Sequence, residues 1–102
     1  MERINYFKNY NKYAKEIKKF LSKHFENFEM YVFGSVVIGE YSIGLSDIDI
    51  AIVSDEFEKR DRKLMIYDLL FEKYFNFPFE FHLLTKKQWS FFKKFIKKFV
   101  KV

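Results

Sequence analysis

Two aspartates at the start of an apolar, β-branched run are the first indication of chemistry in this sequence. Asp47 and Asp49 flank Ile48, and the run continues to Val53. Aspartate is disfavoured in strands, and side chains two residues apart in a strand point to the same face. We therefore expect the two carboxylates side by side, opposite the isoleucines of the run. Their mutual repulsion is relieved by a divalent cation that prefers oxygen ligands, such as Mg²⁺.

A third carboxylate, Glu80, stands between two phenylalanines in a later strand-like segment. If the two strands are neighbours, Glu80 joins Asp47 and Asp49 in an acidic cluster that can hold two metal ions for phosphoryl displacement. The alternatives are a solvated strand end for the aspartates and a solvent-facing or lysine-paired position for Glu80. His82 is expected on the same face as Glu80. We interpret it as a partly buried, packed histidine rather than a partner of Glu80 or of a phosphate.

The segment 34–44 contains all three glycines of the chain, and its first two residues have the character of a phosphate-binding turn. Gly34-Ser35 follows the strand-like run Glu29–Phe33 and precedes a short apolar segment, which predicts a strand-to-helix turn. Exposed backbone amides in such a turn bind phosphate, and glycine permits close approach. Ser35 adds a hydroxyl donor. A triphosphate bound there would lie beside metal ions on the acidic strand.

Hydrophobic periodicity outlines the elements that must position these groups. We expect helices over about residues 2–25, 59–74 and 86–101, strands over 29–33, 47–53 and 79–84, and a short helix after Gly34. In the middle helix the expected inner stripe is Leu64, Tyr67, Leu70, Phe71 and Tyr74. Thr85 and Gln88 predict a capping box at the start of the last helix. This order predicts a single α/β (α+β) domain over residues 1–102, with helices packed on a small mixed sheet and a catalytic core over about 28–85.

Composition narrows the class of protein. The chain has 102 residues and no cysteine, which excludes disulfide scaffolds and thiolate metal sites. It has no apolar run of about 18 residues and no signal-like N-terminus, so we expect a cytoplasmic protein without a membrane partner. The net charge of +5 suits a nucleotide or RNA partner. In the predicted last helix, five lysines fall on one side: Lys93, Lys94, Lys97, Lys98 and Lys101.

The segments 33–39 and 45–53 together resemble the minimal nucleotidyltransferases of the DNA polymerase beta superfamily. The resemblance extends from about residue 14 to the last predicted helix, nearly the whole chain. It implies the nucleotidyltransferase fold. It also implies roles for five residues: Gly34 and Ser35 in the phosphate-binding turn, Asp47 and Asp49 as the metal-binding pair, and Glu80 as the third carboxylate.

The same resemblance implies a mechanism and a partner. Asp47 and Asp49 are expected to hold Mg²⁺, and Glu80 to help hold a second ion and to assist deprotonation of an acceptor hydroxyl. ATP is the expected donor, attacked in line at its α-phosphate with loss of pyrophosphate. Relatives are often encoded beside small helical HEPN toxins and act as antitoxins by adenylylating a tyrosine of the toxin. The predicted function is therefore that of a protein adenylyltransferase antitoxin, whose partners are a nucleoside triphosphate and a HEPN-type protein.

Three departures from the family pattern qualify this prediction. Ile38 stands where many relatives carry a basic residue, which puts nucleotide affinity in doubt. Eleven residues separate Ser35 from Asp47, one more than in the commonest form. The third carboxylate is Glu80 rather than an aspartate, which makes it the least secure metal ligand or base of the three.

Other functions remain open at this point. The same chemistry could modify a small molecule or an RNA end. The chain could also be a non-catalytic module that neutralises a helical partner by docking, which Ile38 favours, or the lysine-rich last helix could bind RNA. The Gly34-Ser35 turn and the Asp47-x-Asp49 pair argue against the last two, because unused carboxylates in an apolar strand cost stability.

Overall fold

A computed structural model of the chain describes residues 3–102. Its α-helices are α1 (Arg3–Lys8), α2 (Tyr10–Leu21), α3 (Ser35–Ile38), α4 (Arg60–Tyr74) and α5 (Lys86–Phe92). Its strands are β1 (Glu29–Phe33), β2 (Ile48–Val53), β3 (Phe79–Leu84) and β4 (Phe99–Lys101), and two 3₁₀ turns are η1 (Asp55–Glu58) and η2 (Lys93–Phe95). None of the helices in this described part has the length and apolarity needed to cross a membrane.

The four strands form one mixed sheet in the order β3-β2-β1-β4. β2 pairs with β3 in parallel, and β1 pairs with β2 and with β4 in antiparallel fashion. In this register Asp49 lies beside Glu80 on one side and beside Phe33 on the other. The predicted α+β class is confirmed, and the second and third predicted strands are neighbours, which is the condition on which the proposed acidic cluster depended.

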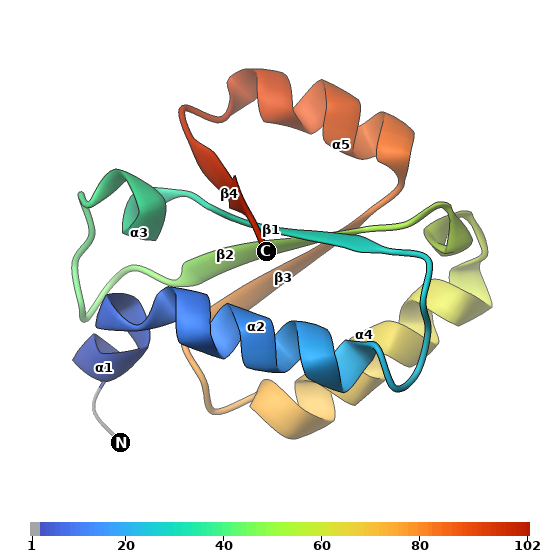
Figure 1. The fold of residues 1–102 in the computed structure, drawn as a ribbon, viewed down its shortest axis with the longest axis horizontal. Helices are drawn as coiled ribbons and strands as arrows, with labels where there is room; N and C mark the ends of the chain where they lie inside the picture. The colour runs from blue at the N-terminus through green and yellow to red at the C-terminus, as the bar shows by residue number, and fades with distance from the viewer. Residues whose placement is uncertain (1–2) are drawn as a thin grey trace.

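One face of the sheet carries the main hydrophobic core. In Figure 1, α1, α2 and α4 lie on this side of the strands, whereas α5 lies on the other side. Ile48, Ile50 and Ile52 of β2 are completely buried in this core. Ile17 of α2 and Ile66 of α4 pack into the same cluster. The alternation of β2 therefore directs its isoleucines into this core and leaves Asp49 on the opposite face, as predicted.

The opposite face is covered mainly by α5, with Ile96 after η2 packed against the same cluster. Trp89 of α5 is buried and stacks on Tyr31 of β1, with ring centroids 4.5 Å apart. The predicted capping box fixes the start of this helix, because the Thr85 side chain accepts from the Gln88 amide at 3.2 Å and the Gln88 side chain accepts from the Thr85 amide at 2.9 Å. Beyond the reach of α5, the ends of β2 and β3 near Asp49 are only partly covered.

The predicted N-terminal helix over 2–25 is divided and ends earlier. α1 and α2 meet at Asn9, and α2 ends at Leu21; the predicted start at residue 2 lies outside the described residues. Phe25 leaves the helical path and is buried against Phe28 and Phe57, with ring centroids 4.6 and 5.8 Å away. Burial of this ring in the core outweighs continuation of the helix.

The predicted C-terminal helix over 86–101 is wrong beyond Phe92. After η2 the chain becomes extended, and β4 pairs with the free edge of β1. Lys101 contacts Glu29 at 2.6 Å, and the hydrogen bond from Lys101 lowers the pKa of Glu29 from its ordinary value. Main-chain pairing with β1 therefore overrides the helical periodicity of residues 93–101. The lysine-rich helical face, on which the RNA-binding hypothesis depended, is not formed.

The inner side of α4 also differs from the prediction. Leu70 and Tyr74 are buried as expected, but the third buried position is Ile66. Phe71 is 69% exposed, and Leu64 and Tyr67 are also exposed. The apolar positions of α4 surround most of the helix, so the sheet covers some of them and leaves the others at the surface.

Candidate functional site

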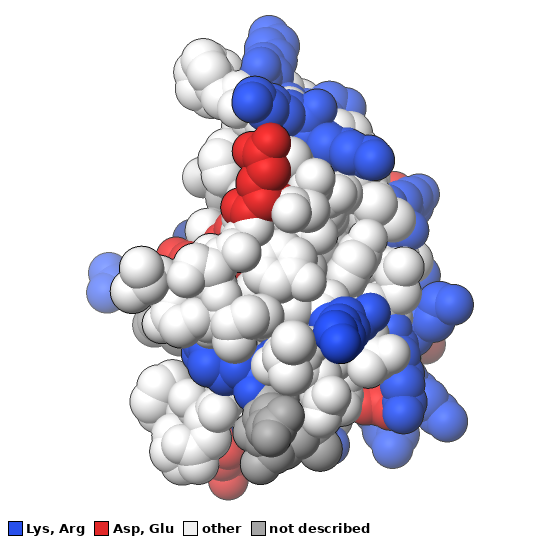
Figure 2. Space-filling model, turned by 90° about the vertical axis from the view of Figure 1, so that its left-hand side faces the viewer, with Lys and Arg blue, Asp and Glu red and all other residues white. Residues whose placement is uncertain are grey.

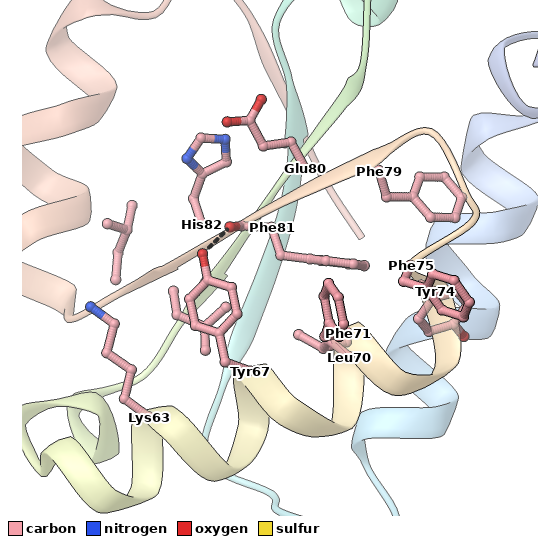
Figure 3. Close-up of a pocket in the computed structure, with 12 residues that line it drawn as sticks. Lys63, Tyr67, Leu70, Phe71, Tyr74, Phe75, Phe79, Glu80, Phe81 and His82 are labelled. Carbon is pink, nitrogen blue, oxygen red and sulfur yellow. Dashed lines mark hydrogen bonds between the residues drawn. The ribbon is translucent and has the colours of Figure 1, made fainter.

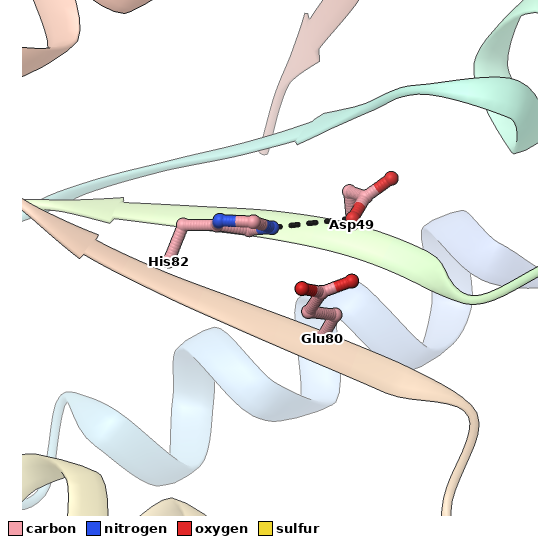
Figure 4. Close-up of side chains that lie close together, drawn as sticks. All are labelled: Asp49, Glu80 and His82. Atoms are coloured by element: carbon pink, nitrogen blue, oxygen red, sulfur yellow. Dashed lines mark hydrogen bonds and ion pairs between the residues drawn. The ribbon is translucent and has the colours of Figure 1, made fainter.

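Asp49 and Glu80 lie side by side where β2 and β3 run in parallel. Figure 4 shows their carboxylates on the same side of the two strands, together with His82. Ligand atoms from these three side chains all lie within 4.8 Å of one another, and they are the only such group of three among residues 3–102. Glu80 is exposed, whereas Asp49 is 24% exposed at its side chain. The parallel register, which places both residues at the same level, accounts for this proximity.

His82 contacts Asp49, not Glu80. Its Nε2 lies 3.2 Å from Oδ1 of Asp49, which makes the imidazole N–H the donor and the carboxylate the acceptor. The ring also lies against Phe33 and Phe92, with centroids 5.1 and 6.0 Å away. His82 is thus the packed histidine that the sequence indicated and, in addition, a group that fixes the orientation of the Asp49 carboxylate.

Gly34 has no side chain, and Oδ2 of Asp49 occupies the space that a side chain would need. A methyl group added at Gly34 would overlap Oδ2 of Asp49, and the backbone at Gly34 has φ of +84°. A side chain there would have to displace the carboxylate and would also strain the backbone. The two oxygens of Asp49 are therefore divided between a hydrogen bond to His82 and close packing on the turn.

The turn after β1 forms as predicted. α3 begins at Ser35, and Gly39 ends it in a left-handed conformation, with its amide donating to the Ser35 carbonyl at 2.9 Å. The amides of Ser35 and Val36 have no protein acceptor in the described part of the chain, as is usual at the start of a helix. They are available to an anion beside Gly34.

Asp47 is not brought into the cluster. It lies one residue before β2, its side chain is 50% exposed, and its Oδ1 contacts Nη2 of Arg3 at 3.4 Å. Arg3 also donates to the backbone carbonyls of Ile43 and Ser46. The first helix thus holds the loop before β2 and pairs with one of the predicted metal ligands.

Two contacts in this region were not foreseen from the sequence. The pairing of Arg3 with Asp47 joins residues 44 positions apart, and no local pattern indicates it. The role of His82 had a signal, because the spacing Glu80-x-His82 places both side chains on one strand face. The phenylalanines around His82 favoured a packing interpretation, and the partner of the imidazole belongs to a different strand.

The donor set of Asp49, Glu80 and His82 fits a hard divalent cation. Carboxylate oxygens are the ligands that Mg²⁺ prefers, and Asp49 and Glu80 provide them from adjacent strands. Since Nε2 of His82 already contacts Asp49, this imidazole suits the role of an orienting partner better than that of a ligand. Asp49 and Glu80 could therefore hold a cation next to the amides of Ser35 and Val36.

The basic charge of the chain does not concentrate in one patch on the α3 side of the molecule. Figure 2 shows lysines and arginines mainly at the top and along one side of this face, with uncharged residues over most of its middle. The basic side chains visible on this face are therefore separated by uncharged surface rather than gathered beside α3.

A groove lies next to the cluster, along the free edge of β3. It has a volume of about 490 Å³ and is lined by residues of β3 and α4, including Glu80 and His82. Figure 3 shows both of these side chains on one side of β3, with the rings of Phe81, Phe71 and Tyr67 on the other side. The groove thus connects the candidate metal ligands with an aromatic surface.

Comparisons with known proteins point to one family. The model of the nucleotidyltransferase domain family matches residues 14–102. A crystal structure of a presumed nucleotidyltransferase is 53% identical in sequence, with a TM-score of 0.79, and the match covers 88% of this chain and 97% of that one. A second, from Sulfolobus solfataricus at 1.40 Å resolution, is also described as a presumed nucleotidyltransferase. It is 28% identical, with a TM-score of 0.66, and the match covers 97% of this chain and 84% of the other. The search of curated proteins gives no match.

Proposed function

The chain belongs to the nucleotidyltransferase domain family, and from this premise we propose that it transfers AMP from ATP to a hydroxyl group of a protein. The observation that carries the proposal is the pairing of Asp49 with Glu80 beside the turn at Gly34. The family generally uses a divalent metal and a nucleoside triphosphate. The adjacent carboxylates of Asp49 and Glu80 suit the metal. The amides of Ser35 and Val36 in the neighbouring turn suit the phosphates.

We assign the metal ligands to Asp49, Glu80 and Asp47. The first two are supported by their proximity. Asp47 is supported by the family resemblance and by its exposed position one residue before β2, where it contacts Arg3. These carboxylates would hold a divalent cation, with Mg²⁺ favoured by their oxygen ligands, and the cation would supply positive charge to neutralise the triphosphate. A second cation is part of the proposal because three carboxylates suit a two-metal site.

The residues of the chain have separate tasks in the proposed reaction. The amides of Ser35 and Val36 and the Ser35 hydroxyl donate to phosphate oxygens, and Gly34 permits their close approach. His82 holds the Asp49 carboxylate in one orientation. Glu80, which is exposed, accepts the proton of the acceptor hydroxyl. The acceptor oxygen bonds to the α-phosphorus, the bond from that phosphorus to the β-phosphate bridge breaks, and its electron pair leaves with pyrophosphate.

For the acceptor we propose a tyrosine of a helical HEPN-type toxin, which would make the chain an antitoxin. This proposal is supported by the resemblance to minimal nucleotidyltransferases and by the aromatic groove next to Glu80. The alternative is modification of a small molecule or an RNA end by the same residues. A purely docking role is the non-catalytic alternative.

The test uses the purified protein with a HEPN-type partner, Mg²⁺ and ATP labelled at either the α- or the γ-phosphate. We expect the label to reach the partner from the α-position only, together with an adenylate-sized increase in its intact mass. Asp49→Asn should abolish both signals, whereas Asp68→Asn, an exposed aspartate on α4, should leave them unchanged. Transfer from the γ-position, or equal activity of the Asp49→Asn variant, would contradict the proposed chemistry.

A further inference from the structure

We propose that the groove between β3 and α4 binds the acceptor, and that the acceptor is a polypeptide held by large apolar side chains. In this arrangement the apolar side chains of the acceptor occupy the aromatic part of the groove. The acceptor hydroxyl lies on the opposite side of β3, at Glu80. The inference rests on the proposed function, because it describes the second substrate of the same site.

The position of the groove supports this role. β3 is the terminal strand of the sheet, so its outer edge is not covered by another strand in the described structure. Glu80 and His82 line the groove from one side of this edge, and Phe81 lines it from the other side. Figure 3 shows these side chains projecting to opposite sides of the same strand. A ligand in the groove would therefore be next to the proposed catalytic carboxylate.

The aromatic rim of the groove is exposed in a way that packing within the chain does not explain. Phe71 of α4 and Phe75, the first residue after α4, are 69% and 62% exposed, and their ring centroids are 5.9 Å apart. Tyr67, one turn before Phe71, is 41% exposed. Large apolar side chains gathered at the surface beside a cavity are typical of an interaction site. Here they offer ring faces to apolar side chains of a partner.

The charge of the lining argues against a nucleic-acid acceptor. Lys63 is the one basic residue among those that line the groove, apart from His82. Grooves that bind single-stranded nucleic acid combine aromatic rings with several basic side chains along the phosphate backbone. A lining with a single lysine and many rings instead favours the apolar side chains of a polypeptide.

The partner is held by its side chains rather than by strand pairing. The hydroxyl of Tyr67 donates to the carbonyl of Phe81 at 3.0 Å. This hydrogen bond covers the middle of the β3 edge, where an added strand would have to pair. Recognition therefore depends on the rings of Phe71 and Phe75 and on the cavity behind them.

A second exposed pair of rings provides a matched control. Phe91 and Phe95 are 65% and 73% exposed, with centroids 5.3 Å apart, and they do not line the groove. They have the same spacing in the sequence as Phe71 and Phe75. Replacing either pair by serine removes a similar amount of exposed apolar surface, so the two double variants differ mainly in location.

The experiment measures binding without nucleotide or metal, in ¹⁵N-labelled Asp49→Asn protein, so it does not depend on catalysis. The probes are a lysine-flanked hexapeptide with one tyrosine and two phenylalanines, and a counterpart with serines in place of the phenylalanines. We expect the first peptide to shift the amide signals of residues 79–84 and of Phe71 and Phe75. Its Kd should rise at least tenfold in the Phe71→Ser, Phe75→Ser variant and change less than twofold in the Phe91→Ser, Phe95→Ser variant.

Several results would overturn the inference: absence of binding, shifts centred elsewhere, equal binding of both peptides, or equal losses in both double variants. Sedimentation of the unliganded protein gives a further outcome. Self-association that the Phe71→Ser, Phe75→Ser variant abolishes would assign the surface to a second copy of the chain and contradict the proposal. Because AMP transfer is measured separately with labelled ATP, failure of the groove and failure of the proposed function are distinguishable.

Discussion

The two faces of the sheet use the same strands for different purposes. Among the described residues, seventeen buried side chains form the cluster under α1, α2 and α4, whereas four form the cluster under α5. Ile50 and Asp49 are adjacent in β2, yet Ile50 is completely buried and Asp49 is partly accessible. The closed face supplies most of the apolar burial, and the half-covered face leaves room for carboxylates and a ligand. The candidate site lies where α5 ceases to cover the strands.

The largest expected effect tests the closed face. Ile50→Ala should lower the free energy of unfolding by about 2–5 kcal/mol, because it removes a fully buried side chain and leaves a cavity. Ile96→Ala, on the partly covered face, should cost clearly less because Ile96 is only half-buried. Denaturant unfolding of both variants provides the comparison. Equal losses would show that the two faces contribute alike.

The next effect concerns the contact between Gly34 and Asp49. Gly34→Ala should destabilise the fold by of order 1–3 kcal/mol, because it combines a strained backbone with displacement of the carboxylate. The other two glycines separate these contributions. Gly39 has a positive φ but open space around it, and Gly44 has open space without a positive φ. We expect Gly39→Ala to lose only the stability that backbone strain costs, and Gly44→Ala to lose little. If denaturant unfolding shows that Gly34→Ala loses no more stability than Gly39→Ala, the overlap with Asp49 is contradicted.

A smaller effect is expected at the start of α5. Thr85→Ala should cost about 1 kcal/mol by removing the capping hydrogen bond, whereas Thr85→Ser should retain most of it. Trp89 is the one tryptophan of the chain and lies on this face, so its emission reports the docking of α5 directly. Unchanged stability and unchanged Trp89 emission in Thr85→Ala would indicate that burial alone holds the helix.

The smallest effect is a loss of stability at alkaline pH. Burial is the main cause that raises the pKa of Tyr6, Tyr31 and Tyr74 above the ordinary value of 10.0. Above that pH the unfolded chain releases these protons more readily than the folded chain, so stability should fall as the pH rises from 10 through the raised pKa values. Tm measured between pH 8 and 11 checks this, and Tyr74→Phe should reduce the slope. A slope unaffected by that substitution would exclude Tyr74 as a contributor.

Strands β1, β2 and β3, the turn at Gly34 and the start of α5 could be predicted because their signals are local. Neighbouring residues specify each of these elements: the β-branched run after Asp47 specifies β2, the Gly34-Ser35 turn specifies the start of α3, and the capping box at Thr85 specifies the start of α5. Glu80 was expected beside Asp49 only if their strands were neighbours, and the parallel register that brings the two together is a long-range pairing that no local signal indicates. These features coincide with the half-covered face, where polar residues interrupt apolar strands.

The remaining features depend on contacts between distant segments. Residues 93–101 have helical periodicity, but the free edge of β1 offers main-chain hydrogen bonds that only a strand can use. Arg3 reaches Asp47 across the loop before β2. The exposed rings of Phe71 and Phe75 could not be distinguished from core residues, because an apolar helix does not show in its sequence which side the sheet will cover.

The most direct test of the account is the location of a bound divalent cation. Mn²⁺, a paramagnetic substitute for Mg²⁺, would be titrated into ¹⁵N-labelled protein, and line broadening would be mapped onto the amides. We expect broadening centred on Asp49 and Glu80, with affinity at least tenfold lower in Asp49→Asn and unchanged in Asp68→Asn. Broadening centred on other carboxylates, or equal affinity in all three proteins, would contradict the proposal that the half-covered face of the sheet is a metal-dependent active site.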